Sequence, residues 1–162
     1  MSSKSLAFTM QHQKQTNWCW AAVSTSVSLF YNANSGWTQC SVANSSLGQS
    51  TCCSSPSSSF CNKPWYLNEA LTTTSNLNSY TSGAQVMSTI QAQINAGKPI
   101  GCRIQWRPSG GHFVLINGYN VQASTVDIRD PWYGNSNGLS LNTFTNNYKG
   151  SGYWNYTYYT QS

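Results

Sequence analysis

The segment from Trp18 to Tyr31 constrains the fold more than any other part of this chain. It contains no Gly or Pro, and apolar side chains recur along it at Trp20, Val23, Val27, Phe30 and Tyr31. This spacing is the period of a helix with one apolar face. Thr16 and Asn17, just before it, are good N-cap residues. The sequence therefore predicts a helix over 18–31 that buries one face in a core.

Cys19 lies in the first turn of the predicted helix. The free backbone N–H groups and the helix dipole favour a negative charge there. A thiol at such a position loses its proton more easily and becomes a nucleophile. The alternatives are that Cys19 is an inert buried cysteine or half of a disulfide.

The rest of the chain changes from helical to β character near its middle. Further helices are predicted over 37–43, 64–71 and 84–96. In the last of these, Val86, Ile90 and Ile94 share a face, with Ser82 as N-cap and Gly97 as C-terminal cap.

Branched and aromatic residues, separated by Gly and Pro, predict strands over 78–82, 100–106, 112–119, 124–129 and 153–160. A helical first half followed by a mainly antiparallel sheet is an α+β arrangement. From the length we expect a single domain over 1–162, with a helical lobe over about 1–77 and a β-sheet lobe over about 78–162.

Charged side chains are scarce, at 7% of 162 residues, and the eight Lys and Arg form no run. Nucleic-acid binding therefore has little support. No apolar stretch approaches the roughly 20 residues that a membrane span requires. We expect a monomer without cofactor, metal or membrane partner. A surface rich in hydroxyl and amide groups suits a secreted protein. No signal peptide is visible, and the short lead-in before Cys19 leaves no room for an inhibitory pro-segment in this chain.

Four of the six cysteines crowd into a serine-rich part of the chain: Cys40, Cys52, Cys53 and Cys61. We predict two disulfides among them, and the three possible pairings stay open. A zinc site is the competing interpretation, but no His lies nearby and the spacing lacks a C-x-x-C pair. Cys102, in an apolar strand, is expected to be a buried free thiol.

A cysteine nucleophile needs a base, and the chain has two histidines. His112 opens a predicted strand directly after two glycines, so it can lie at a cleft edge. The alternative is a hydrogen-bonded strand-end histidine without a chemical role. His12, in the polar lead-in, is expected to be solvated.

The base in turn needs an acceptor that orients it. Asp130 ends the next predicted strand, so a tight hairpin brings it to the same end of the sheet as His112. Alternation puts Asp130 on the apolar face and Asp127 on the other, as a surface partner of Arg129 or another base. Trp132 could shield the Asp130–His112 hydrogen bond from water.

Acyl transfer also requires donors for the oxyanion. The backbone N–H of Cys19 is one candidate. The side-chain amides of Gln11, Gln13 and Gln15 all qualify by chemistry for the second.

These residues, taken in order, resemble the papain clan of cysteine proteases: Gln13, Cys19 six residues later, Trp20, Gly111-His112 and Asp130-Pro131-Trp132. The segment Asn-Trp-Cys-Trp-Ala-Ala at 17–22, the Gly-His-Phe-Val strand and the Asp-Pro-Trp segment are most similar to the avirulence-effector cysteine proteases of plant-pathogenic bacteria. The resemblance covers most of the chain from Gln11 to Trp132.

The resemblance implies a two-lobed papain-like fold in which the cysteine helix faces a sheet that carries His112 and Asp130. It also selects Gln13 for the oxyanion hole, together with the Cys19 backbone. The implied activity is a cysteine endopeptidase with a Cys19–His112–Asp130 triad and a thioester intermediate, acting on a protein or peptide substrate. Secretion by a bacterium is implied, with delivery into a host cell as a further option.

Two other functions stay open on the sequence. A Cys-His peptidoglycan amidase or leader-peptide peptidase would share the order of cysteine and histidine. A non-enzymatic glycan-binding module would use stacking aromatics, namely Trp37, Trp65, Tyr133, Trp154, Tyr158 and Tyr159. Such aromatics are more simply core and sheet residues.

Overall fold

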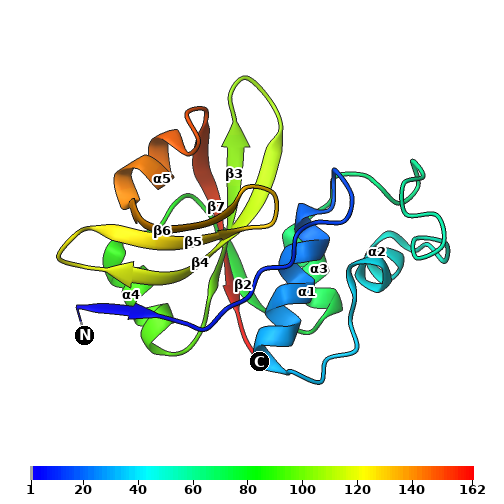
Figure 1. Ribbon diagram of the computed structural model, residues 1–162, viewed down its shortest axis with the longest axis horizontal. Helices are drawn as coiled ribbons and strands as arrows, with labels where there is room; N and C mark the ends of the chain where they lie inside the picture. The colour runs from blue at the N-terminus through cyan, green and yellow to red at the C-terminus, as the bar shows by residue number, and fades with distance from the viewer. Residues whose placement is uncertain (1) are drawn as a thin grey trace.

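A computed structural model describes residues 2–162 and divides them between a helical side and a sheet (Figure 1). The helices are α1 (Cys19–Tyr31), α2 (Gln39–Leu47), α3 (Leu67–Thr73), α4 (Met87–Asn95) and α5 (Leu141–Asn147). The strands are β1 (Ser3–Ser5), β2 (Leu77–Ser82), β3 (Ile100–Trp106), β4 (Gly111–Asn120), β5 (Thr125–Asp130), β6 (Gly134–Ser140) and β7 (Gly152–Thr160). The α+β class predicted from the sequence is confirmed.

The strands form one antiparallel sheet in the order β2-β7-β3-β4-β5-β6, and β1 pairs with the far end of β4. Residues 3–5, which we assigned to the helical lobe, therefore belong to the sheet. Helices α1, α2 and α3 gather to one side of the sheet in Figure 1, whereas α4 and α5 lie with the strands.

Two apolar clusters share the sheet between them. On β4, Phe113 and Leu115 pack with α1, α2 and α3, while Val114 and Ile116 pack with α4, α5 and the inner face of β5. Successive residues of a strand point to opposite faces, so a strand covered on both faces reads as a continuous apolar run. This layering fixes which face each residue of β4 presents to the helical side.

Several predicted boundaries were wrong. The N-cap of α1 is Trp18, not Thr16 or Asn17. Val86 is the N-cap of α4 and is 65% exposed, so it does not share the buried face of Ile90 and Ile94, and Ser82 ends β2 instead of capping α4.

The other two helices also begin later than predicted. Thr38 caps α2 through a capping box with Ser41, so the helix begins at Gln39. It ends at Leu47, past our predicted end at 43, with Gly48 as C-cap. Pro64 precedes α3 by a short extended link. The sequence analysis missed β6 and α5 altogether.

The cysteine cluster is oxidised, as predicted, and the pairing is Cys40 with Cys53 and Cys52 with Cys61. Cys19 and Cys102 are free and buried, which confirms the expectation for Cys102. Within residues 2–162 no helix has the length and apolar character to cross a membrane.

Candidate active site

A cleft of about 590 Å³ lies where the helical side meets the sheet. Cys19, the first residue of α1, lines it together with His112, which stands near the start of β4. Gln13 lines it as well. The structure therefore brings Gln13 and Cys19, which are six residues apart, into one cavity with His112 from the second half of the chain.

The segment that carries Cys19 is held by the loop that follows the second disulfide. The indole N–H of Trp18 donates to the Cys61 carbonyl at 2.8 Å, and that of Trp20 donates to the Lys63 carbonyl at 3.0 Å. Both indoles are completely buried or nearly so. These bonds tie the two residues that flank Cys19 to a single loop.

Asn62 explains why the expected caps do not cap the helix. Its side-chain oxygen accepts from the Asn17 backbone N–H at 2.9 Å, and its side-chain nitrogen donates to Thr16 Oγ1 at 3.0 Å. The Asn17 side chain in turn donates to the Asn62 carbonyl. Thr16 and Asn17 therefore fasten the loop, and Trp18 takes the N-cap position without a side-chain cap.

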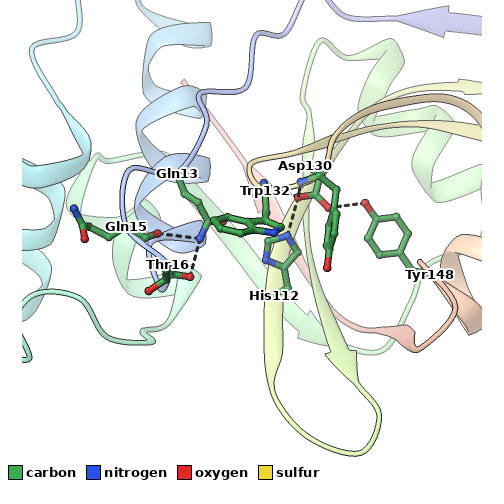
Figure 2. A network of polar contacts seen from close by, with 8 residues as sticks. Gln13, Gln15, Thr16, His112, Asp130, Trp132 and Tyr148 are labelled. Atoms are coloured by element: carbon green, nitrogen blue, oxygen red, sulfur yellow. Dashed lines mark hydrogen bonds and ion pairs between the residues drawn. The ribbon is translucent and has the colours of Figure 1, made fainter. Parts of the chain in front are cut away.

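His112 and Asp130 are bonded, as the strand register predicted (Figure 2). His112 Nε2 lies 2.8 Å from Asp130 Oδ1, and both side chains are buried. Val126, Ile128 and Asp130 share the buried face of β5. The hairpin between Asn120 and Thr125 is tight, so the two strands carry the pair to one end of the sheet.

Asp130 accepts three further hydrogen bonds. Its Oδ1 accepts from the backbone N–H groups of Trp132 and Tyr133 at 2.8 and 3.0 Å. Its Oδ2 accepts from the hydroxyl of Tyr148 at 2.6 Å (Figure 2). The sequence analysis missed Tyr148, because it follows β6 and α5, which we did not predict.

The surroundings of His112, Asp130 and Tyr148 determine the protonation state of each side chain. Burial opposes the charge of His112, but its hydrogen bonds and Coulombic interactions with Asp130 and Cys19 outweigh burial and raise the His112 pKa to about 9. Burial favours the neutral form of Asp130, yet the hydrogen bond and charge of His112 and the bonds from Tyr148 and Tyr133 hold its pKa below the ordinary value. Burial, followed by the charge of Asp130, raises the pKa of Tyr148 far above its usual range. At neutral pH His112 is therefore an imidazolium, Asp130 a carboxylate and Tyr148 a donor.

Two aromatic rings contact the imidazole of His112. Trp106 stacks on His112, with centroids 5.9 Å apart, and on Tyr148 at 6.1 Å. Tyr133 meets His112 edge-on at 6.3 Å. Trp132, the ring expected to shield the pair, stacks on His12 at 5.5 Å and is 46% exposed. Tyr133 is 54% exposed, so the half-buried Trp106 is the more enclosed of the two rings in contact with His112.

Gln13 lies in the cleft wall with its amide turned to the backbone (Figure 2). Its Nε2 donates to the carbonyls of Gln15 and Thr16 at 3.0 and 2.9 Å, and its Oε1 is buried with no hydrogen-bond partner among residues 2–162. Gln13 is only 4% exposed, while Gln11 and Gln15 are half-buried and do not line the cleft. Of the three candidate glutamines, only Gln13 shares a cavity with Cys19.

The remaining titratable candidates lie apart from the cleft. His12 is exposed, as expected. Asp127 accepts from the Ser5 hydroxyl and from the Gly138 backbone N–H. The expected partnership of Asp127 with Arg129 was wrong, because Arg129 donates to the Ile128 carbonyl and the Asn137 side chain.

The aromatics proposed as a glycan platform do not form one. Trp154 and Tyr158 are buried, and of the six aromatics Tyr133 alone is exposed. The remaining three, Trp37, Trp65 and Tyr159, are half-buried. All of them except Tyr133, which lines the cleft, pack in the core or lie on the sheet, as the simpler interpretation held.

Comparison with known families adds an independent finding. The family described as "Papain-like cysteine protease AvrRpt2" matches residues 2–149. This match covers every site residue described above, and it confirms the resemblance drawn from the sequence motifs. A comparison with curated proteins finds no match.

Proposed function

Since this chain belongs to the AvrRpt2 family of papain-like cysteine proteases, which are hydrolases of peptide bonds, we propose that it is an endopeptidase with Cys19 as nucleophile, His112 as acid and base, and Asp130 as orienting acceptor. The observation that carries this assignment is the bonded His112–Asp130 pair, which shares one cleft with the first-turn cysteine. Its substrates are proteins or peptides.

The reaction uses two proton transfers at His112. The Cys19 thiolate attacks the peptide carbonyl carbon, and the C–N bond breaks as His112 gives its proton to the leaving amine. The product is a thioester on Cys19. Water then attacks the thioester while His112 takes a proton, and the thiolate leaves. Asp130 holds Nε2, so the other ring nitrogen is the one available to sulfur and substrate.

The oxyanion is stabilised by the Cys19 backbone N–H and the Gln13 amide in this proposal. The first N–H groups of an α-helix have no intrahelical acceptor and favour negative charge. Gln13 Nε2 is bonded to two backbone carbonyls, so it serves the oxyanion by sharing or releasing one of them. Donors of this kind are worth about 10²–10³ in turnover.

The matched cysteine variants test this function. Cys19→Ala should abolish hydrolysis of a peptide substrate and keep the native circular dichroism spectrum, whereas Cys102→Ala, which removes the other free thiol, should retain activity. Cys102 is fully buried in β3, and burial raises its pKa well above the ordinary value, so it is a poor nucleophile. Undiminished hydrolysis by purified Cys19→Ala would refute the assignment.

The two disulfides also support a setting for the enzyme. Disulfides persist in oxidising environments and are rare in the reducing cytosol. We therefore propose that the protein folds on a secretory route and acts as a secreted bacterial protease. When protein isolated from its native source is unfolded without reductant and alkylated, mass spectrometry should find only two alkylated thiols per chain; six would contradict the secreted setting.

A further inference from the structure

The cleft contains one strongly basic side chain and no acidic one. Among the described residues that line the cleft, Arg103 is the only lysine or arginine, and none is aspartate or glutamate. Arg103 lies on β3 opposite Phe113 of β4, one position along from the pair formed by Ile104 and His112. It therefore stands on the sheet wall of the cleft, close to the proposed reaction centre.

Arg103 has hydrogen-bond donors to spare. Its Nη1 donates to Gln105 Oε1 at 2.9 Å and to Asn155 Oδ1 at 3.3 Å, both neutral amide oxygens. Across residues 2–162 no carboxylate lies within ion-pair distance of it. A guanidinium offers five N–H donors in a planar fork. Both side-chain bonds of Arg103 come from Nη1, so the edge formed by Nε and Nη2 has no acceptor among residues 2–162.

Gly111 makes room for the guanidinium. A Cβ at this position would lie 2.8 Å from Cζ and 3.0 Å from Nε of Arg103, closer than side chains tolerate. The charged group therefore packs against the backbone directly before His112. Arg103 is half-buried there, so water competes less for its donors than at an open surface.

Two further cations contact aromatic rings that line the cleft. Lys63 Nζ lies 5.5 Å from the ring centroid of Trp65, and Lys149 Nζ lies 5.4 Å from that of Tyr133; both rings line the cleft. None of the three acidic residues of the chain is among the lining residues, and the net charge is +5. In the proposed mechanism the charges of the Cys19 thiolate and the His112 imidazolium offset each other, so the charge that remains at the cleft is that of Arg103, and it attracts ligands of the opposite sign.

We infer that Arg103 binds an acidic side chain of the substrate, so that the enzyme prefers peptides with Glu or Asp close to the scissile bond. The inference rests on the proposed function and names its substrate class. A carboxylate can accept two parallel N–H bonds from a guanidinium, which a neutral amide side chain cannot reproduce.

Matched peptides test this preference. Starting from a peptide that the wild type cleaves, each position flanking the scissile bond carries Glu in one peptide and Gln in the other. The wild type should show kcat/KM at least about tenfold higher for Glu at one of these positions, since a hydrogen bond to a charged group exceeds one to a neutral group. Raising the ionic strength should shrink that ratio.

Three variants give the matched comparison, with the Glu-to-Gln ratio as readout. Arg103→Gln should bring the ratio close to one, and Arg103→Lys, which keeps the charge but not the fork, should retain part of it. Lys98→Gln removes a positive charge outside the cleft lining and should leave the ratio unchanged. Thermal unfolding of each variant checks that it is folded.

Equal hydrolysis of Glu and Gln peptides at every position by the wild type would overturn this inference alone. A Glu preference that survives in both Arg103 variants would also overturn it. Hydrolysis of no peptide at all would overturn the proposed function as well.

Discussion

The bridge between Cys52 and Cys61 should support the nucleophile, while the bridge between Cys40 and Cys53 should not. The Cys61 carbonyl accepts the indole N–H of Trp18, the residue before Cys19. We therefore expect the double substitution Cys52→Ala/Cys61→Ala to lower peptide hydrolysis in protein that is still folded. The matched control is Cys40→Ala/Cys53→Ala.

The two bridges close loops of similar length, with sequence separations of 9 and 13. The chain-entropy relation assigns each of them about 3 kcal/mol of unfolding free energy. Cys52 and Cys61 are fully buried, so removing their sulfurs also costs packing, whereas Cys53 is exposed. Both double variants should therefore lose stability, the buried pair somewhat more.

The two double variants should differ far more in kcat/KM than in their free energy of unfolding. A misplacement of about 1 Å near the reacting atoms can cost roughly 10²-fold in rate. Without its bridge, the loop through Cys61, Asn62 and Lys63 no longer holds Trp18 and Trp20 in place. We expect kcat/KM to fall by about 10²-fold in Cys52→Ala/Cys61→Ala and by only a few-fold in the control.

The assay measures kcat/KM well below each variant's unfolding midpoint, and tryptophan fluorescence in urea gives the stability. Equal loss of activity in both double variants would refute the proposed link between the loop and Cys19. So would wild-type turnover in folded Cys52→Ala/Cys61→Ala.

Four further predictions concern the groups around the proposed base. Asp130→Ala should abolish most turnover, while Asp130→Asn should keep part of it, because the amide oxygen can still accept from His112 and the Tyr148 hydroxyl can turn to accept from the amide nitrogen. Asp127→Ala should change kcat by less than about twofold, and a large loss of kcat in this variant would refute the assignment of Asp130 as the orienting acid. Tyr148→Phe removes a donor to Asp130 and raises the pKa of that carboxyl, so loss of activity on acidification should begin at higher pH than in the wild type. The same fall of activity with decreasing pH in the variant and the wild type would contradict this prediction. Because the pKa of His112 in the folded protein is raised to about 9, the stability from its charge should be complete below about pH 6.5 and lost as the pH rises through 9. NMR titration of the imidazole measures the pKa, and urea unfolding at both ends of this window measures the stability; an imidazole midpoint near 6.5 would contradict the prediction. Gln13→Ala should lower kcat by about 10² or more with a smaller effect on KM, and an effect confined to KM would remove Gln13 from the oxyanion hole.

The pairing of base and acceptor was predictable because it depends on simple periodicity. Alternation along β5 puts Asp130 on the face of Val126 and Ile128, and the short hairpin after Asn120 makes β5 the neighbour of β4. A register shift between Ile116 and Gly118, which the sequence does not reveal, then moves the pairing by one residue on the way to His112. A one-residue slip would have moved Asp130 to the solvent face, so the apolar pattern specifies the register strongly.

The position of the Cys19 helix was also predictable from the sequence, but its N-cap residue was not. Thr16 and Asn17 have the side chains of N-caps, yet both bond to Asn62, which lies far along the chain. Local propensity describes what a residue can do within its own segment. Here a tertiary contact with the disulfide loop decided the outcome.

Tyr148 was missed because its supporting elements have no apolar signature. Strand β6, Gly134–Ser140, is mostly exposed at the sheet edge and reads as a loop of Gly, Asn and Ser. Helix α5 buries one side chain, Phe144, so it shows no helical period. The residue that completes the bonds of Asp130 therefore follows two elements that only the folded sheet stabilises.

Covalent labelling tests most directly whether Cys19 is the nucleophile. The protein is treated with an epoxide inhibitor of cysteine proteases, and the modified residue is mapped by peptide mass spectrometry. We predict one label per chain, on Cys19, with hydrolysis lost in proportion to labelling and no label in Cys19→Ala. A label on another residue, or full hydrolysis by completely labelled protein, would contradict the account.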